Sequence, residues 1–69
     1  MGVGTNIRKI REQQGLKQTD LARAAGITPT FLCQVERETK NPSLQIAAEL
    51  ARVLHCRLED FLNGKEETA

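Results

Sequence analysis

The sequence contains no tryptophan and no tyrosine, and it has two phenylalanines, two prolines and two cysteines among its 69 residues. A hydrophobic core must therefore consist of Leu, Ile, Val and Ala with Phe31 and Phe61, a composition that suits small packed helices. A chain of this length forms one domain and buries only about 60% of the surface that its unfolded state exposes, so we expect marginal stability. The expected domain covers residues 1–64, and residues 65–69 form a short acidic C-terminal tail.

Long apolar runs and clustered metal ligands are also missing. No run approaches the roughly 20 residues of a membrane span, and no signal peptide is recognised, so we expect a cytoplasmic protein. Cys33 and Cys56 do not form a CxxC pair, and His55 beside Cys56 brings no fourth ligand, so we expect two reduced thiols and no metal or cofactor. The chain has one histidine, no recognisable carboxylate pair and no phosphate-binding glycine loop, so it is not expected to be an enzyme or to bind a small molecule.

The net charge is small but unevenly distributed. Residues 1–42 contain seven Lys and Arg against four Asp and Glu, a net charge of +3, whereas residues 43–69 contain three against five, a net charge of −2. The amino-terminal part is therefore the better candidate for contact with phosphate. Such an imbalance is also common in proteins that never bind nucleic acid, so charge alone does not establish this function.

Helix start and stop signals divide the chain into five helices and leave no credible strand. The expected helices cover about residues 6–14, 18–25, 29–36, 44–54 and 58–62. Thr5, Thr28 and Ser43 are the expected N-caps, and Pro29 suits the first position of a helix because its missing N–H is not needed there. Gly15 is expected to follow the end of the first helix in a left-handed conformation.

The stretch between residues 18 and 35 has the pattern of two short helices that cross at a steep angle. Its small and apolar residues form two stripes at helical spacing: Leu21, Ala22 and Ala25 in one, and Leu32 and Val35 in the other. Gly26 lies between them, where a helix can end in the conformation that only glycine adopts at low cost. This unit is a helix-turn-helix, whose second helix commonly enters the major groove of DNA.

A resemblance to a known family extends over residues 7–62 and includes the stretch REQQGLKQTDLARAAGITPTFLCQVERETKNPSLQIAAELARVL. The chain resembles the Cro/lambda-repressor-type helix-turn-helix, the xenobiotic-response-element family, in the glutamine that opens the second helix, the Leu-Ala pair, the glycine turn, the glutamate that closes the third helix and the Asn-Pro-Ser entry to the fourth. The resemblance implies an all-α, compact five-helix lambda-repressor-like domain with its helix-turn-helix at the second and third helices. It also implies binding of double-stranded DNA, frequent dimerisation and regulation of transcription.

By position, the resemblance assigns the base edges and the adjacent DNA backbone to Thr28, Pro29, Thr30 and Gln34. Gln34 is the strongest candidate for direct readout, because an amide can bond bidentately to adenine. Phe31 lies on the flank of this helix and has two readings, contact with a sugar or thymine methyl and packing against the preceding helix.

The resemblance assigns phosphate contacts to Gln18 and, just past the third helix, to Arg37, Lys40 and Asn41. Ordinary solvated charge is the alternative reading for these residues. Cys33 is expected to be partly exposed on the flank of the third helix opposite to Phe31, with no assigned role.

Arg11 and Glu36 match a pair that forms an internal ion pair in this family, so neither is counted as a DNA contact. The chain departs from the family pattern at three positions. Glu38 and His55 replace the usual glycine, so each exit needs another backbone geometry or carries strain, and Lys17 replaces the usual helix cap. Glu38 also brings a negative charge near the expected position of the DNA backbone.

The leading hypothesis is a sequence-specific DNA-binding regulator, with repression as the favoured activity, that acts as a homodimer on a palindromic operator. The dimer surface is placed at Leu58, Phe61 and Leu62, although these residues can equally close the core of the monomer. The alternative function is an adaptor or antitoxin-like module whose main contact is another protein. Near-neutral charge and Glu38 favour this alternative slightly.

Overall fold

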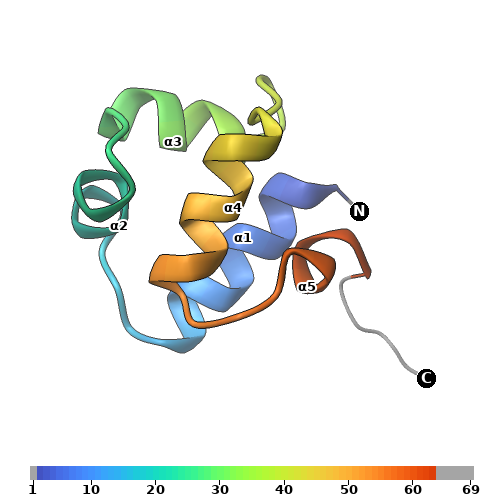
Figure 1. Ribbon diagram of the computed structural model, residues 1–69. Coiled ribbons are helices and arrows are strands. Elements are labelled where there is room, and N and C mark those ends of the chain that lie inside the picture. The colour runs from blue at the N-terminus through green and yellow to red at the C-terminus, as the bar shows by residue number, and fades with distance from the viewer. Residues whose placement is uncertain (1, 64–69) are drawn as a thin grey trace.

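The computed structural model describes residues 2–63 of the chain, and these residues form five helices and no strand (Figure 1). The helices are α1 (Val3–Gln13), α2 (Gln18–Ala25), α3 (Pro29–Glu36), α4 (Leu44–Val53) and α5 (Leu58–Asn63). The predicted all-α fold with five helices is thus confirmed. Residue 64 and the expected acidic tail at residues 65–69 lie outside the described residues.

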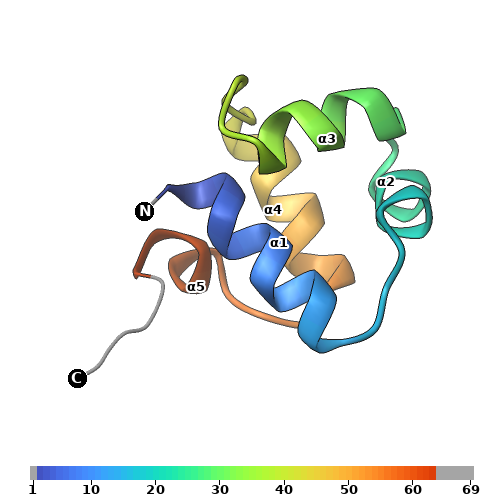
Figure 2. The ribbon, with the colours of Figure 1, turned by 180° about the vertical axis from the view of Figure 1, so that it is seen from behind.

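The helices pack around one core to which each of them contributes. Helix α1 contacts α3 and α5, α2 contacts α3 and α4, and α4 also contacts α5. The front and back views show α1 and α4 in the centre, α2 and α3 on one side and α5 on the other (Figures 1 and 2). The buried core residues are Ile7, Leu21, Ala22, Leu32, Val35, Leu50, Ala51, Leu54 and Phe61.

Helices α1 to α4 share one type of ending, in which a residue takes the left-handed conformation and two N–H groups turn back to carbonyls of the last turn. The left-handed residues are Gly15 (φ 72°), Gly26 (φ 77°), Glu38 (φ 68°) and His55 (φ 56°). At the end of α3, Glu38 N–H donates to the Val35 carbonyl and Thr39 N–H donates to the Gln34 carbonyl, both at 3.0 Å. Glu38 and His55 therefore adopt the left-handed conformation that glycine usually provides. Because each has a Cβ, this conformation is sterically strained at both positions.

The expected start of the first helix at residue 6 is wrong, because α1 begins at Val3 with Gly2 as its N-cap residue. Thr5 lies in the first turn of α1 and is not its cap. The backbone N–H and the hydroxyl of Thr5 donate to Oε2 of Glu38 at 2.8 and 2.7 Å. A carboxylate from 33 residues further along the chain thus satisfies the start of α1, and no local sequence pattern reveals this acceptor.

The other two predicted caps are present. The Thr28 hydroxyl accepts from Phe31 N–H at 3.1 Å, and the Ser43 hydroxyl accepts from Ile46 N–H at 3.2 Å. These bonds explain why α3 and α4 begin where the sequence predicts.

Two amide side chains, one in α1 and one directly after it, bond to the carboxyl-terminal half of the chain. Asn6 is 3% exposed and donates through Nδ2 to the carbonyl of Phe61 in α5. Gln14 donates through Nε2 to the carbonyl of Leu54, just after α4, at 2.6 Å. The two amides therefore connect α1 to α5 and its carboxyl end to the end of α4.

Candidate nucleic-acid interface

Helices α2 and α3 form the helix-turn-helix, and their contact is made by small and apolar side chains. Leu21, Ala22, Leu32 and Val35 are fully buried. Gly26 ends α2 at a φ of 77°, and the chain turns into α3. Because these side chains point inward, the opposite face of α3 is turned to solvent.

The outward face of α3 lines a hollow of about 650 Å³ that α2 closes on one side. The hollow is lined by Gln18, Pro29, Thr30, Cys33, Gln34, Arg37 and Thr39. The α3 residues of this set recur at helical spacing, so they form one continuous face. A concave face of this kind displays amide, hydroxyl and guanidinium groups together.

Phe31 and Cys33 lie on opposite flanks of α3, as the sequence predicts. Cys33 is partly exposed and lines the hollow beside Thr30 and Gln34. It follows Pro29 by four positions, a spacing that brings two residues to one face of a helix. Phe31 is half-buried and packs against the core, which supports its reading as packing between the two helices.

The loop after α3 folds back on the last turn of the helix. The carbonyl of Gln34 accepts from the backbone N–H of Thr39 at 3.0 Å, from its hydroxyl at 3.0 Å and from Lys40 N–H at 3.3 Å. Arg37, Lys40 and Asn41 are all exposed. These bonds hold the start of this exposed, basic loop against the last turn of α3.

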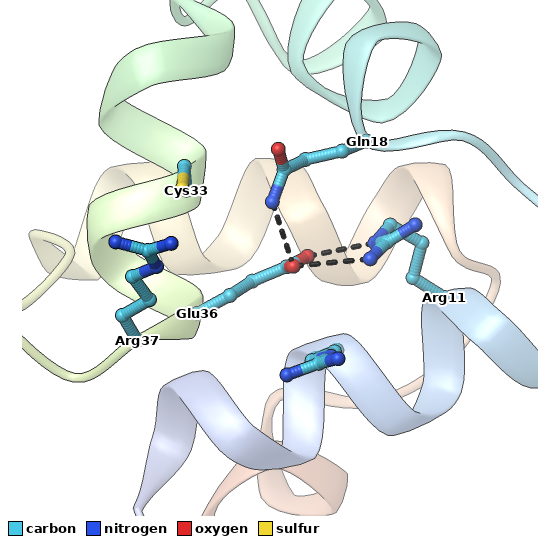
Figure 3. A pocket seen from close by; sticks show the side chains of 6 residues that line it. Arg11, Gln18, Cys33, Glu36 and Arg37 are labelled. Atoms are coloured by element: carbon cyan, nitrogen blue, oxygen red, sulfur yellow. Dashed lines mark hydrogen bonds and ion pairs between the residues drawn. The ribbon is translucent and has the colours of Figure 1, made fainter.

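A buried carboxylate connects the outward face to α1 (Figure 3). Glu36 is 6% exposed and accepts from Arg11 Nε at 2.8 Å and from Arg11 Nη2 at 3.1 Å. Gln18 donates through Nε2 to Oε1 of the same carboxylate at 3.0 Å. Arg11 also donates through Nη1 to the carbonyl of Leu16 at 2.8 Å, so the expected ion pair is present and each guanidinium nitrogen of Arg11 makes a hydrogen bond.

The amino end of α2 has no side-chain cap. Lys17 occupies the N-cap position and accepts no hydrogen bond through its side chain. The first N–H groups of α2 therefore have no side-chain acceptor, and the dipole of the helix adds positive potential there. The side-chain amide of Gln18 donates to Glu36. The group of Gln18 that can bind an anion at this helix end is therefore its backbone N–H.

The carboxylate of Glu38 is directed to α1. The hydroxyl of Thr5 and then its backbone N–H lower the pKa of Glu38, because both donate to the charged form. Its charge is thus compensated by the start of a helix. The negative charge of Glu38, which in the sequence favours the alternative to DNA binding, is thus hydrogen-bonded to Thr5 within the protein.

A second hollow, of about 350 Å³, lies between α1, α4 and α5, and its lining is mostly apolar. It is lined by Val3, Asn41, Pro42, Leu44, Ala47, Leu58 and Leu62. Leu44 is 74% exposed and Leu62 is 64% exposed, which is unusual for large apolar side chains. The assignment of Phe61 to a dimer surface is wrong, because Phe61 is fully buried in the core of the monomer.

The described residues hold no group of three or more His, Cys, Asp or Glu side chains placed to bind a metal ion. Cys56 is half-buried, and burial followed by the nearby Asp60 raises the pKa of its thiol. Within residues 2–63, no helix is long and apolar enough to cross a membrane.

Comparisons with known proteins place this geometry in a family. A helix-turn-helix family model, HTH_3, matches residues 7–61. An HTH-type transcriptional regulator of Archaeoglobus fulgidus is 38% identical over 64 residues, which cover 91% of each chain. The transcriptional regulator SinR of Bacillus licheniformis is 33% identical over 67 residues, so that 96% of this chain is covered but only 60% of SinR.

A structural relative has the same helical arrangement. The P22 c2 repressor, solved in complex with a synthetic operator, has a TM-score of 0.86 and 25% sequence identity to this chain. The match covers 94% of this chain and 98% of the repressor chain. From the family match, the curated relatives and this shared fold, the chain belongs to the Cro/C1-type helix-turn-helix family of DNA-binding transcriptional regulators.

Proposed function

We propose that this chain acts as a sequence-specific repressor and that α3 enters the major groove of its operator. The observation that carries the proposal is the hollow along the outward face of α3, which Gln18 closes at the amino end of α2. A helix in the major groove presents such a face to base edges, while the flanking groups meet the DNA backbone. The relatedness to a repressor solved with its operator supports this placement.

Within this face, Gln34 and Thr30 are proposed to read bases. The Gln34 side chain can donate and accept in one plane, which matches N6 and N7 of adenine. Thr30 is exposed and offers a hydroxyl and a methyl group. Pro29 adds apolar surface, whereas the Thr28 hydroxyl already caps α3 and leaves mainly its methyl group for contact with the DNA backbone.

The DNA backbone is proposed to lie against the amino end of α2 and the loop after α3. Backbone N–H groups near Gln18 can bind one phosphate, as the amino ends of helices commonly do. Arg37, Lys40 and Asn41 are exposed on the loop that the Gln34 carbonyl holds in place. Phosphate contacts of this kind fix the register of the protein, and the base contacts then supply specificity.

We also propose that two copies of the chain occupy one palindromic site and contact each other through the apolar hollow at α1, α4 and α5. Leu44 and Leu62 project from this hollow, so each copy carries both exposed leucines and an apolar depression that can receive them. A surface that contains both halves of a contact suits a two-fold dimer. Asn41 lines the same hollow, so this surface adjoins the proposed DNA-binding loop.

Selection of bound duplexes from a random library tests the DNA-binding proposal. We expect one motif to be enriched, and Gln34→Ala to relax preference at one base pair by about 1–3 kcal/mol. Lys40→Ala is expected to weaken binding to every sequence and to reduce the salt slope by about one. Gln45→Ala is the matched control, because Gln45 is an exposed glutamine of α4 outside the hollow. Failure of any duplex to be enriched at any salt concentration would overturn the proposal.

Sedimentation at micromolar concentration, with and without the selected duplex, tests the dimer. We expect Leu44→Lys to shift the protein toward the monomer and to weaken binding to a two-half-site operator more than to a single half-site. Ala24→Lys is the control, because it places the same charge on an exposed position of α2 away from the apolar hollow. A wild-type protein that remains monomeric on the two-half-site duplex would exclude the dimer.

A further inference from the structure

A third hollow, of about 270 Å³, lies between α1 and α3 next to the proposed reading face (Figure 3). Its lining residues are Arg8, Arg11, Gln18, Cys33, Glu36 and Arg37. The lining thus contains three guanidinium groups and one carboxylate, a formal charge of +2. Neither the sequence pattern nor the proposed function gives Arg8 a role.

The charges within this hollow divide into the neutral pair of Arg11 and Glu36, Arg8, whose partner Glu12 is not a lining residue, and Arg37. Arg11 and Glu36 neutralise each other through two hydrogen bonds, and the carboxylate also accepts from Gln18. Among residues 2–63, no carboxylate lies within ion-pair distance of Arg37. The positive charge of Arg37 is therefore available to an anion.

Arg8 forms an exposed ion pair with Glu12, which a phosphate group can replace. Its Nε lies 3.1 Å from Oε2 of Glu12, and the two side chains are 59% and 53% exposed. An exposed ion pair one helical turn apart contributes about 0.3–0.5 kcal/mol, so solvent and salt compete with it effectively. A guanidinium group prefers the bidentate geometry that a phosphate offers.

We propose that this hollow binds a phosphate of the DNA backbone, with Arg8 and Arg37 as its cationic ligands. The site rests on the proposed function, and it extends the DNA contact from the helix-turn-helix onto α1. It shares Gln18, Cys33 and Arg37 with the reading hollow, so a strand that passes the amino end of α2 can reach both. The buried Arg11–Glu36 pair forms the floor and fixes the distance between α1 and α3.

Salt-dependent binding of Arg8→Gln to the selected operator tests this site. The variant is expected to weaken binding to operator and random duplexes by the same factor and to reduce the salt slope by about one. When the salt concentration rises from 50 to 200 mM, the factor by which the affinity of the variant falls should then be about four times smaller than the factor for the wild type. Urea unfolding of both proteins verifies that the substitution leaves the fold intact.

Arg52→Gln is the matched control. Arg52 pairs with Glu49 at 2.7 Å on exposed α4 and is 67% exposed, so it resembles Arg8 in charge and partner but lies outside the three hollows. Equal salt slopes for the Arg8→Gln variant and this control would overturn the phosphate site. Equal slopes would exclude the α1 contact only. The proposed function would still hold if the wild type binds the operator and Gln34→Ala alters the base preference.

Inorganic phosphate distinguishes a backbone site from a site for a free anion. At matched ionic strength, a DNA-backbone site predicts that replacing chloride by phosphate shifts the urea midpoint of wild type and of the Arg8→Gln variant by the same amount, because phosphate stabilises folded proteins in general. A larger stabilisation of the wild type than of the Arg8→Gln variant by phosphate, with the DNA salt slope unchanged, would assign the hollow to a free anion and overturn the backbone contact.

Discussion

Replacement of Glu38 separates two opposing contributions of one residue. Glu38 stands at a φ of 68°, where an L-residue is strained by about 1–2 kcal/mol relative to a right-handed conformation. Its carboxylate accepts from the backbone N–H and the hydroxyl of Thr5 at the start of α1. The Glu38→Ala variant would keep the strain and lose the acceptor, whereas the Glu38→Gly variant would lose both. The two variants therefore measure the two contributions separately.

The expected magnitudes follow from these contacts. An acceptor at a helix start contributes about 1 kcal/mol, and its negative charge adds about 0.3–1 kcal/mol through the helix dipole. We expect Glu38→Ala to lower the free energy of unfolding by about 1–2 kcal/mol, and Glu38→Gly to recover about 1 kcal/mol of this loss. A domain of this size has a total stability of roughly 3–10 kcal/mol, so both differences are measurable.

Urea unfolding followed by circular dichroism is a suitable assay. With a slope near 1 kcal/mol per molar for a small domain, Glu38→Ala should shift the midpoint by about 1 M or more. An alanine variant as stable as the wild type would show that the bonds to Thr5 contribute nothing. A glycine variant no more stable than the alanine variant would refute the argument from backbone strain.

Glu38→Gln tests the contribution of charge, because it keeps an oxygen acceptor but does not ionise. The pKa of Glu38 in the folded protein is lowered from 4.5, so its stabilising effect is present above that value and is lost as the pH falls through the lowered pKa. The stability difference between wild type and the Glu38→Gln variant should therefore be largest near neutral pH and disappear in acid. A difference that does not change with pH would exclude the charge as its cause.

Two further predictions concern the contact between α1 and α3. Glu36→Gln should cost about 3–5 kcal/mol in unfolding free energy because it leaves Arg11 buried without its counter-ion, and Arg11→Met with Glu36→Leu should recover much of this loss; a double variant that loses as much as the single variants Arg11→Met and Glu36→Leu lose together would contradict the pairing. Gly4→Ala should cost about 1–3 kcal/mol, since a Cβ at that position overlaps the carbonyl oxygen of Val35 and forces the two helices apart. An unchanged urea midpoint for Gly4→Ala would show that α1 can shift freely.

The helix-turn-helix was predictable because its signals are local. Thr28 caps α3 from three residues away, and Gly26 ends α2 in a conformation that glycine favours. The bounds of α2 and α3 therefore agree with those expected from the sequence. Helical spacing also places Phe31 and Cys33 on opposite flanks of α3, as the structure has them.

The features that the sequence did not predict depend on contacts between distant segments. The true start of α1 uses the carboxylate of Glu38, and Phe61 is buried because α1 covers it and Asn6 bonds to its carbonyl. Helix α5 alone shows three large apolar residues, and its periodicity cannot decide which of them a distant helix will cover. Leu44 was missed as a surface residue for the same reason, since an apolar residue at the start of an amphipathic helix is normally placed in the core.

The shared carboxylate of Glu36 has a consequence for genetics. Gln18 at the edge of the reading face and Arg11 on α1 both donate to it, so a substitution at any of these three positions disturbs the other two. A screen for loss of repression would therefore recover Arg11 and Glu36 alongside the residues that touch the operator. Suppressors of such alleles should arise inside the protein, at residues packed around this network, whereas suppressors of Gln34 alleles should arise in the operator sequence.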